Sequence, residues 1–190
     1  MDKRIQKTKD NFRATLSQLI QEKPFEKINV KEICERAHTS RVTFYTYYGD
    51  KYDLLSDLFD SIKEQVKENF KTLQEKTNPS NSFVTSLQNI LTAVMTSESA
   101  SFSTTYLVNN MDMTYFYFRF LMDCVGQFEI EYPQESRTSY PLQKINAFIV
   151  LGLWGFLHVD DGKTTEKESM DDVMHLIEDI ASSNIFQHDK

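Results

Sequence analysis

The sequence predicts an all-α protein in which a small N-terminal unit of three helices precedes a larger helical body. Apolar residues recur every three or four positions through most of the chain, which is the period of an amphipathic helix. The 190 residues include only 5 Gly and 4 Pro, and this scarcity of turn-forming residues favours long helices over a β fold. We therefore expect two domains, residues 1–52 and residues 53–190.

The first predicted helix spans residues 3–22 and has one apolar face. That face consists of Ile5, Phe12, Leu16, Leu19 and Ile20. Four basic residues crowd the start of the helix and either contact phosphates or remain in solvent. They are Lys3, Arg4, Lys7 and Lys9. Pro24 ends the helix, and Phe25 and Ile28 are expected to fill the core of the small unit.

Residues 29–55 predict a short helix, a tight turn, a second short helix and the start of a long one. Asn29 is suited to cap the first of these helices, and Glu32, three residues later, can reach back to the cap. The apolar face of this helix consists of Val30, Ile33, Cys34 and Ala37. The turn follows at residues 38–40, and Ser40 is suited to cap the next helix.

The second short helix, residues 41–48, presents two different faces. Phe44 and Tyr48 are four residues apart, so they share a face and can anchor the helix to the core. The other residues point outward or to the flanks and include no carboxylate; they are Arg41, Val42, Thr43, Tyr45, Thr46 and Tyr47. Such a surface suits DNA, because arginine pairs with guanine edges, methyl groups contact thymine, and phenols hydrogen-bond to phosphate.

The start of the long helix predicts a phosphate contact. Gly49 ends the preceding helix, and Asp50 is suited to cap the next one. Lys51 then lies in the first helical turn, where the helix dipole disfavours positive charge. We expect Lys51, together with the exposed backbone N–H groups, to clamp a DNA phosphate.

On these residues the segment resembles the helix-turn-helix of the TetR family of bacterial transcription regulators. That family's pattern runs roughly T-hydrophobic-x-x-I-A-x-x-A-G-V-S-x-G-T-F-Y-x-H-F-x-S-K-x-x-L. The residues in register are Asn29, Val30, Ile33, Ala37, Ser40, Thr43, Phe44, Tyr45, Tyr48, Lys51 and Leu54 or Leu55. The motif covers about a quarter of the chain. Its most specific part is the run Thr43-Phe44-Tyr45, followed by the aromatic Tyr48.

The chain departs from the family pattern at four positions. His38 and Val42 replace glycines, Thr39 replaces valine, and Tyr47 replaces histidine. Histidine tolerates a positive φ better than most residues, so the turn can still form. Val42 adds a side chain where relatives have bare backbone, which predicts a different base preference.

The rest of the chain predicts further helices joined by polar breaks. The long helix runs from Asp50 to about Leu73, and residues 77–82 form a connection. Breaks are expected at residues 97–103 and 133–141. The helices after the connection are predicted at residues 83–95, 104–110, 113–132, 142–159 and 166–185.

Residues 113–132 contain more aromatic side chains than one buried face requires. They either line an adaptable cavity for an apolar or aromatic effector, or form ordinary core. The residues assigned to such a cavity are Phe102, Tyr106, Met113, Phe116, Tyr117, Phe120 and Trp154.

Residues 142–159 are apolar on nearly every side, so this helix must be covered on every side. Gly152 and Gly155 would let another helix approach closely. The resemblance implies that this helix and the helix at 166–185 pair with their copies in a four-helix homodimer interface. The alternative is that both helices close the core of one chain.

Charge is divided unevenly along the chain, whose net charge is −7. Residues 1–52 hold 11 Lys/Arg against 7 Asp/Glu, a net +4, whereas residues 53–190 hold 10 against 21, a net −11. Positive charge thus coincides with the DNA-binding motif, and the acidic body would be repelled by phosphates. Two cysteines in apolar contexts and no apparent signal peptide or bilayer-length apolar run indicate a cytoplasmic protein.

The sequence offers no catalytic constellation. It contains none of the patterns H-E-x-x-H, C-x-x-C, G-x-S-x-G or a phosphate-binding glycine loop. His158, Asp160 and Asp161 lie at a helix end, where such residues are common without a metal. We therefore expect no enzymatic activity, no metal and no cofactor.

Together these features predict a homodimeric regulator that binds a palindromic DNA operator. The resemblance implies a repressor released by a small-molecule effector. The expected DNA contacts are Asn29, Lys31, Thr39, Ser40, Arg41, Val42, Thr43, Tyr45, Thr46, Tyr47 and Lys51. Alternatives are an activator, a regulator that acts mainly through a protein partner, and a helical enzyme or carrier.

Overall fold

The computed structural model describes residues 3–97, 111–131, 140–159, 162–163 and 165–183. These residues form α-helices and one short 3-10 helix and contain no strand, which confirms the all-α prediction. The chain divides into two compact parts. The first holds the described residues of 1–64 and 98–117, and the second holds those of 65–97 and 118–190.

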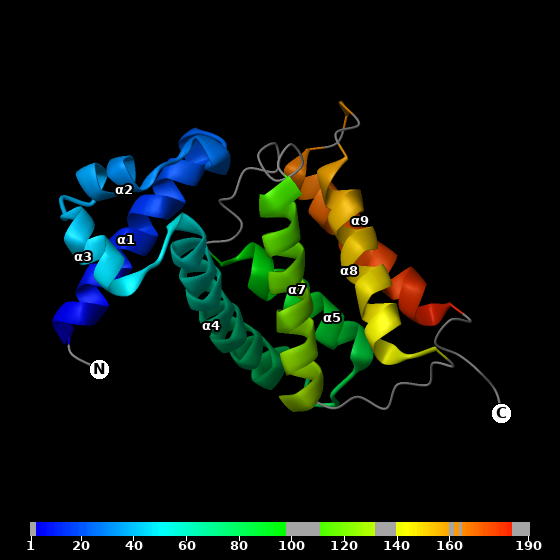
Figure 1. Cartoon of the computed structure of the whole chain (residues 1–190). Coiled ribbons are helices and arrows are strands. Elements are labelled where there is room, and N and C mark those ends of the chain that lie inside the picture. Colours follow the sequence, from blue (N-terminus) through cyan, green and yellow to red (C-terminus); the bar gives the residue numbers. More distant parts are fainter. Residues whose placement is uncertain (1–2, 98–110, 132–139, 160–161, 164, 184–190) are drawn as a thin grey trace. The chain divides into compact units, whose positions relative to one another are not determined.

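One long helix and three short ones build the N-terminal end of the first part (Figure 1). They are α1 (Lys3–Glu22), the 3-10 helix η1 (Phe25–Lys27), α2 (Val30–Arg36) and α3 (Arg41–Tyr47). α2 contacts both α1 and α3. The bounds of α1 and α3 agree to within one residue with those expected from the spacing of apolar residues, whereas η1 was not predicted.

An apolar core holds this N-terminal unit together. Phe12, Leu16, Leu19 and Ile20 of α1 are buried as expected, whereas Ile5 is partly exposed near the start of the helix. Phe25 and Ile28 are also buried, each with 1% of its surface exposed. The next helix, α4 (Lys51–Thr77), adds three leucines to the buried set, Leu54, Leu55 and Leu58.

The second part contains α5 (Phe83–Met95), α8 (Leu142–His158) and α9 (Glu166–Ser182). α9 contacts both α5 and α8. Thr165 and Glu168 form a reciprocal capping box at the start of α9. The shared core of the three helices consists of Leu87, Ile145, Ile149, Leu153, Val173 and Ile177. α7 (Met111–Glu131) and α4 each contribute residues to both parts.

A buried polar network joins the end of α4 to α5. Gln74 Nε2 donates to Ser86 Oγ at 2.9 Å, and Asn89 Nδ2 donates to Gln74 Oε1 at 2.6 Å. Thr77 Oγ1 lies 3.1 Å from Asn89 Oδ1. Buried amides are tolerated when they are hydrogen-bonded, so this network fixes how the two helices meet. These partners also account for the extension of α4 beyond Leu73, where the sequence predicted its end.

Some expectations fall outside the described residues. They are the helix at 104–110, most of the loop at 133–141, and the two carboxyl groups of Asp160 and Asp161. Within the described ranges, none of the helices combines the length and the hydropathy that a bilayer span requires.

Candidate nucleic-acid interface

Side chains cap both short helices, as the sequence predicts. Asn29 Oδ1 accepts from the backbone N–H of Glu32, and Ser40 Oγ accepts from the backbone N–H of Thr43, each at 3.0 Å. Glu32 was expected to reach back to its cap, and this is wrong. Its carboxylate instead lies 2.6 Å from Lys23 Nζ, because this cation comes within reach at the end of α1.

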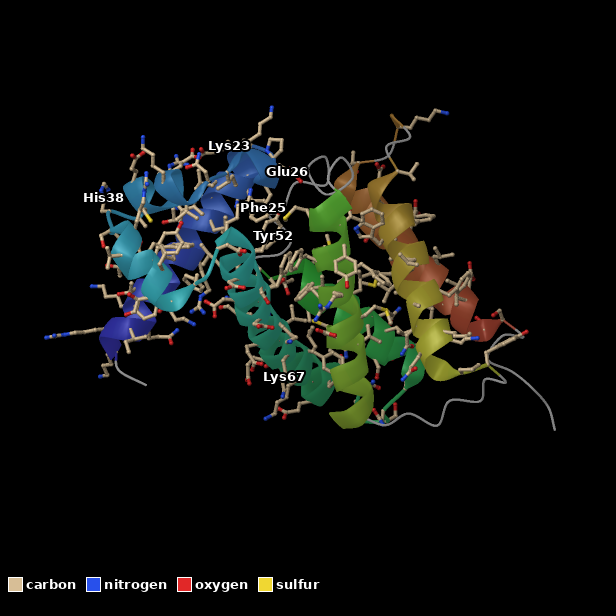
Figure 2. The ribbon with its side chains drawn as sticks, viewed as in Figure 1. Lys23, Phe25, Glu26, His38, Tyr52 and Lys67 are labelled. Carbon is tan, nitrogen blue, oxygen red and sulfur yellow. The ribbon has the colours of Figure 1, made fainter. Side chains whose placement is uncertain are left out.

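The turn between α2 and α3 forms without glycine. The backbone N–H of Thr39 donates to the carbonyl of Cys34 at 3.0 Å, and that of His38 donates to the carbonyl of Glu35 at 3.3 Å. This pair of hydrogen bonds is the Schellman arrangement, which needs one residue in the left-handed region. His38, labelled in Figure 2, supplies it with a φ of 50°. The histidine therefore takes the backbone conformation that the turn glycine has in the family pattern.

The inner face of α3 is fixed by two aromatic rings. Phe44 is fully buried and Tyr48 has 3% of its surface exposed. Phe12 of α1 meets both rings edge-on, at centroid distances of 5.3 Å from Phe44 and 6.0 Å from Tyr48. The Tyr48 hydroxyl donates to Asp57 Oδ2 at 2.7 Å. Burial, and next this hydrogen bond, raise the pKa of Tyr48 well above its ordinary value, so the phenol stays neutral.

The outer face of α3 is open to solvent. Val42 is 79% exposed and Tyr45 58% exposed, both large values for apolar and aromatic side chains. Seven of the predicted contact residues are exposed: Asn29, Lys31, Ser40, Arg41, Val42, Tyr45 and Thr46. The other four are partly buried: Thr39, Thr43, Tyr47 and Lys51. The structure thus places the predicted contacts on α2, α3 and the turn between them, with Lys51 as the exception.

Lys51 does not have the role that the sequence suggested. Its Nζ donates to the main-chain carbonyls of Phe25, Glu26 and Ile28 at 2.9, 3.1 and 2.9 Å. The same ammonium lies 4.5 Å from the centroid of the Phe25 ring. The prediction that the Lys51 side chain clamps a phosphate is therefore corrected. Its positive charge instead interacts with the main-chain carbonyls at the C-terminal end of η1.

The link from α3 to α4 is held by two carboxylates. Asp50 caps α4 as predicted, since its Oδ1 accepts from the backbone N–H groups of Tyr52 and Asp53 at 2.7 and 3.0 Å. Asp53 in turn accepts from the backbone N–H of Gly49 at 2.8 Å. The Tyr52 ring meets Phe25 edge-on at 5.3 Å (Figure 2). Hydrogen bonds to Asp50 and Asp53 and the packing of Tyr52 on Phe25 therefore fix the link between α3 and α4.

The basic residues at the start of α1 divide into two groups. Lys3, Arg4 and Lys7 are exposed, as a phosphate contact requires. Lys9 instead lies 3.2 Å from Asp57 and 5.4 Å from the centroid of the Tyr48 ring. Lys9 therefore makes contacts within the protein, to Asp57 and Tyr48, and not the phosphate contact considered from the sequence.

The residues assigned to an effector cavity are divided between the two compact parts and the residues outside the described ranges. Phe102 and Tyr106 lie outside the described residues. Three of the others belong to the first compact part, where Met113 and Tyr117 are buried and Phe116 is partly buried. The remaining two, Phe120 and Trp154, belong to the second part. The cavity stays a prediction.

α8 has an exposed apolar stripe. The exposed fractions of Phe148, Leu151, Phe156 and Val159 lie between 44% and 72%. These positions and the two glycines, Gly152 and Gly155, recur every three or four residues, so they share one side of the helix. A Cβ added at either glycine would meet no atom within 4 Å. One side of α8 therefore packs in the core of the second part, and the other is exposed among the described residues.

A capped helix, a tight turn and a second helix with one buried and one open face define a helix-turn-helix protein. Comparison with known families agrees, since residues 14–58 match the family described as bacterial regulatory proteins, tetR family. The N-terminal part of the chain thus matches the tetR family, and the fold resembles that of TetR-family regulators.

Individual proteins show the same similarity. An uncharacterized helix-turn-helix-type transcriptional regulator, YxbF of Bacillus subtilis, is 37% identical over 46 residues, which cover 24% of this chain and only 12% of that protein. A solved structure assigned to the TetR-family regulators of Syntrophomonas wolfei is 13% identical with a TM-score of 0.67, covering 94% of this chain and 96% of its own. A TetR transcriptional regulator from Streptococcus agalactiae is 23% identical with a TM-score of 0.57, covering 93% and 96%. At these identities the solved structures show the fold.

Replacing His38 tests the strain at the turn. His38→Gly should raise the free energy of unfolding by about 0.5 kcal/mol or more, because glycine adopts a positive φ without steric cost. His38→Val should lower it by about 1 kcal/mol or more, and His38→Asn should leave it nearly unchanged. Urea denaturation measures all three. If the glycine variant were the least stable, the imidazole would make a contact that outweighs the backbone strain.

Replacing Lys51 separates its two possible roles. Lys51→Met should lower the free energy of unfolding by about 1–3 kcal/mol, because three main-chain carbonyls lose their cationic partner. The salt dependence of DNA binding should stay the same. The exposed neighbour Lys27 provides the control, and Lys27→Met should change stability by less than about 0.5 kcal/mol. If the Lys51 variant kept its stability but its DNA binding depended less on salt, Lys51 would contact a DNA phosphate as first predicted.

Proposed function

We propose that this chain is a sequence-specific DNA-binding regulator whose α3 enters the major groove, one helix from each half of a homodimer. The observation that supports this most is the two-sided character of α3. Phe44 and Tyr48 bind its inner face to the core, while Arg41, Val42 and Tyr45 lie open on the other side. The surrounding segment is also favourable, since residues 36–49 contain two Arg and no Asp or Glu.

The residues of α3 that point away from the core, exposed or partly buried, suggest a division of roles. Arg41, Val42 and Thr43 lie in the first turn of α3, the end that contacts base edges in helix-turn-helix proteins. An arginine pairs with the two acceptors of guanine, and a valine methyl fits against the thymine methyl. The phenols of Tyr45 and Tyr47 would bind phosphates and so set the register of the helix without reading sequence.

The homodimer would form through α8 and α9. The exposed stripe of α8 is too apolar to remain in solvent, and its two glycines leave room for a second helix. A two-fold symmetric pair brings the same stripe from both copies together. Such a dimer reads two half-sites about 34–36 Å apart, so its operator would be a rough palindrome.

Regulation by a small molecule would act through the first part of the chain. The Phe116 ring of α7 stacks on Tyr52 and Phe59 of α4, each at a centroid distance of 6.4 Å. α4 begins four residues after α3 ends. A displacement of Phe116 would therefore move α4 and, through the short link, α3. An apolar effector that binds the two conformations with different affinity would release the operator.

The resemblance to the TetR family supports repression as the sign of regulation. A reporter gene placed behind a selected binding site should be expressed more strongly when this chain is deleted. Lower expression after deletion would instead identify an activator.

Arginine substitution tests the reading role of α3. Arg41→Ala should weaken binding to the best site by about 1–3 kcal/mol and relax the preference at one base pair per half-site. Arg36→Ala is the matched control, because Arg36 is paired with Glu22 at 2.6 Å on the neighbouring helix. That variant should keep every base preference. The measurement is the affinity of each variant for binding sites that carry every single-base change. An Arg41 variant with unaltered base preferences would contradict the base-reading role of Arg41.

A charge placed on the α8 stripe tests the dimer. Phe148→Lys should convert the dimer to monomer in analytical ultracentrifugation, because the interface cannot bury an unpaired ammonium. Tyr115→Lys makes the same kind of change at an aromatic residue that is also 59% exposed, but on α7. It should leave the dimer intact. Dimers that persist in the Phe148 variant would place the interface elsewhere.

A further inference from the structure

Charged and polar groups from α1 and from the end of α3 converge on one carboxylate of α4 in the first part of the chain. Asp57 of α4 accepts from the Tyr48 hydroxyl at 2.7 Å and from Arg13 Nη1 at 3.1 Å through one oxygen. Its other oxygen accepts from Lys9 Nζ at 3.2 Å. Lys9 and Arg13 come from α1, and Tyr48 is the residue that ends α3. Asp57 therefore ties the end of α3 to two other helices.

The Tyr48 contact fixes the direction of α3. The helix has seven residues, and its backbone becomes extended at Tyr48. A helix this short has little stability of its own, so its direction depends on what holds its ends. Ser40 caps the first end, while the Tyr48 ring and its hydroxyl hold the second. Without the hydroxyl contact the ring could still pack, but one directional restraint would be lost.

The contacts with α1 restrain two positive charges close to α3. The side chains of Lys9 and Arg13 are 25% and 14% exposed, so both lie near the surface. Arg13 also pairs with Asp10. If Asp57 lost its charge, these two cations would lose a shared partner. They could then turn to phosphates, which attract cations at any DNA sequence.

We propose that Asp57 is a positioning residue that sets the DNA sequence specificity of this protein. It fixes the direction of α3 through Tyr48, at the end opposite the base-reading turn, and it keeps Lys9 and Arg13 away from the phosphate backbone. Both effects favour the operator over other DNA: the first strengthens specific binding, and the second weakens non-specific binding. This inference rests on the proposed DNA-binding function.

Two variants separate the two effects. Tyr48→Phe removes only the hydroxyl, so affinity for the operator should fall about 3- to 10-fold while affinity for a scrambled duplex is unchanged. Asp57→Asn releases the two cations, so affinity for the scrambled duplex should rise and the slope of log affinity against log salt should steepen by up to about 2. Asp57→Glu keeps the charge and should keep the slope of the unmodified protein.

The control removes the same charge from the same helix. Asp60 pairs with Lys63 at 3.1 Å and is 65% exposed, so Asp60→Asn should leave the ratio of operator to scrambled affinity within about twofold. The measurement is fluorescence anisotropy with an operator selected from random DNA, repeated over a range of salt concentrations, with the folded fraction followed by circular dichroism.

The outcomes distinguish this inference from the proposed function. If Asp57→Asn behaves like Asp60→Asn, or if it weakens binding to both duplexes in proportion to lost folded protein, Asp57 only stabilises the fold and the inference is overturned. If the unmodified protein does not distinguish the selected operator from the scrambled duplex, the proposed function itself fails.

Discussion

The burial of Phe44 and Tyr48 against Phe12 is the interaction on which the rest of the structure depends. A helix of seven residues is not stable in water, so the helical form of α3 comes from this contact with α1. Edge-on aromatic pairs each add about 0.5–1.5 kcal/mol beyond the burial of their surface. Because these two rings face inward, Arg41 and Val42 must face outward. The open surface is thus a consequence of core packing.

Much of this arrangement could be predicted from local sequence. The spacing of apolar residues predicts the helices, since α1 and α5 occupy the expected residues Lys3–Glu22 and Phe83–Met95. The caps at Asn29, Ser40 and Asp50 were predictable as well, because each contact joins residues two or three positions apart. Physical rules of this short range need no knowledge of the fold.

The long-range polar contacts could not be predicted in the same way. Lys51 binds main-chain carbonyls 23 to 26 residues earlier, and backbone acceptors leave no trace in a sequence. Lys9 and Asp57 are 48 residues apart. Two signals were present nonetheless: a lysine in the first turn of a helix opposes the helix dipole, and the hydroxyl of a buried tyrosine needs a partner. Each indicated a missing contact without identifying it: the partners are main-chain carbonyls for Lys51 and the Asp57 carboxylate for Tyr48.

The central claim is that the open face of α3 lies in the major groove of DNA in two copies at once. Methylation interference on a bound duplex tests it most directly, because a methyl group at guanine N7 blocks the major groove and one at adenine N3 blocks the minor groove. If two copies of α3 bind in this way, interference is expected from guanine N7 in two patches about one helical turn apart, related by two-fold symmetry. Interference confined to adenine N3, or to a single patch, would contradict it.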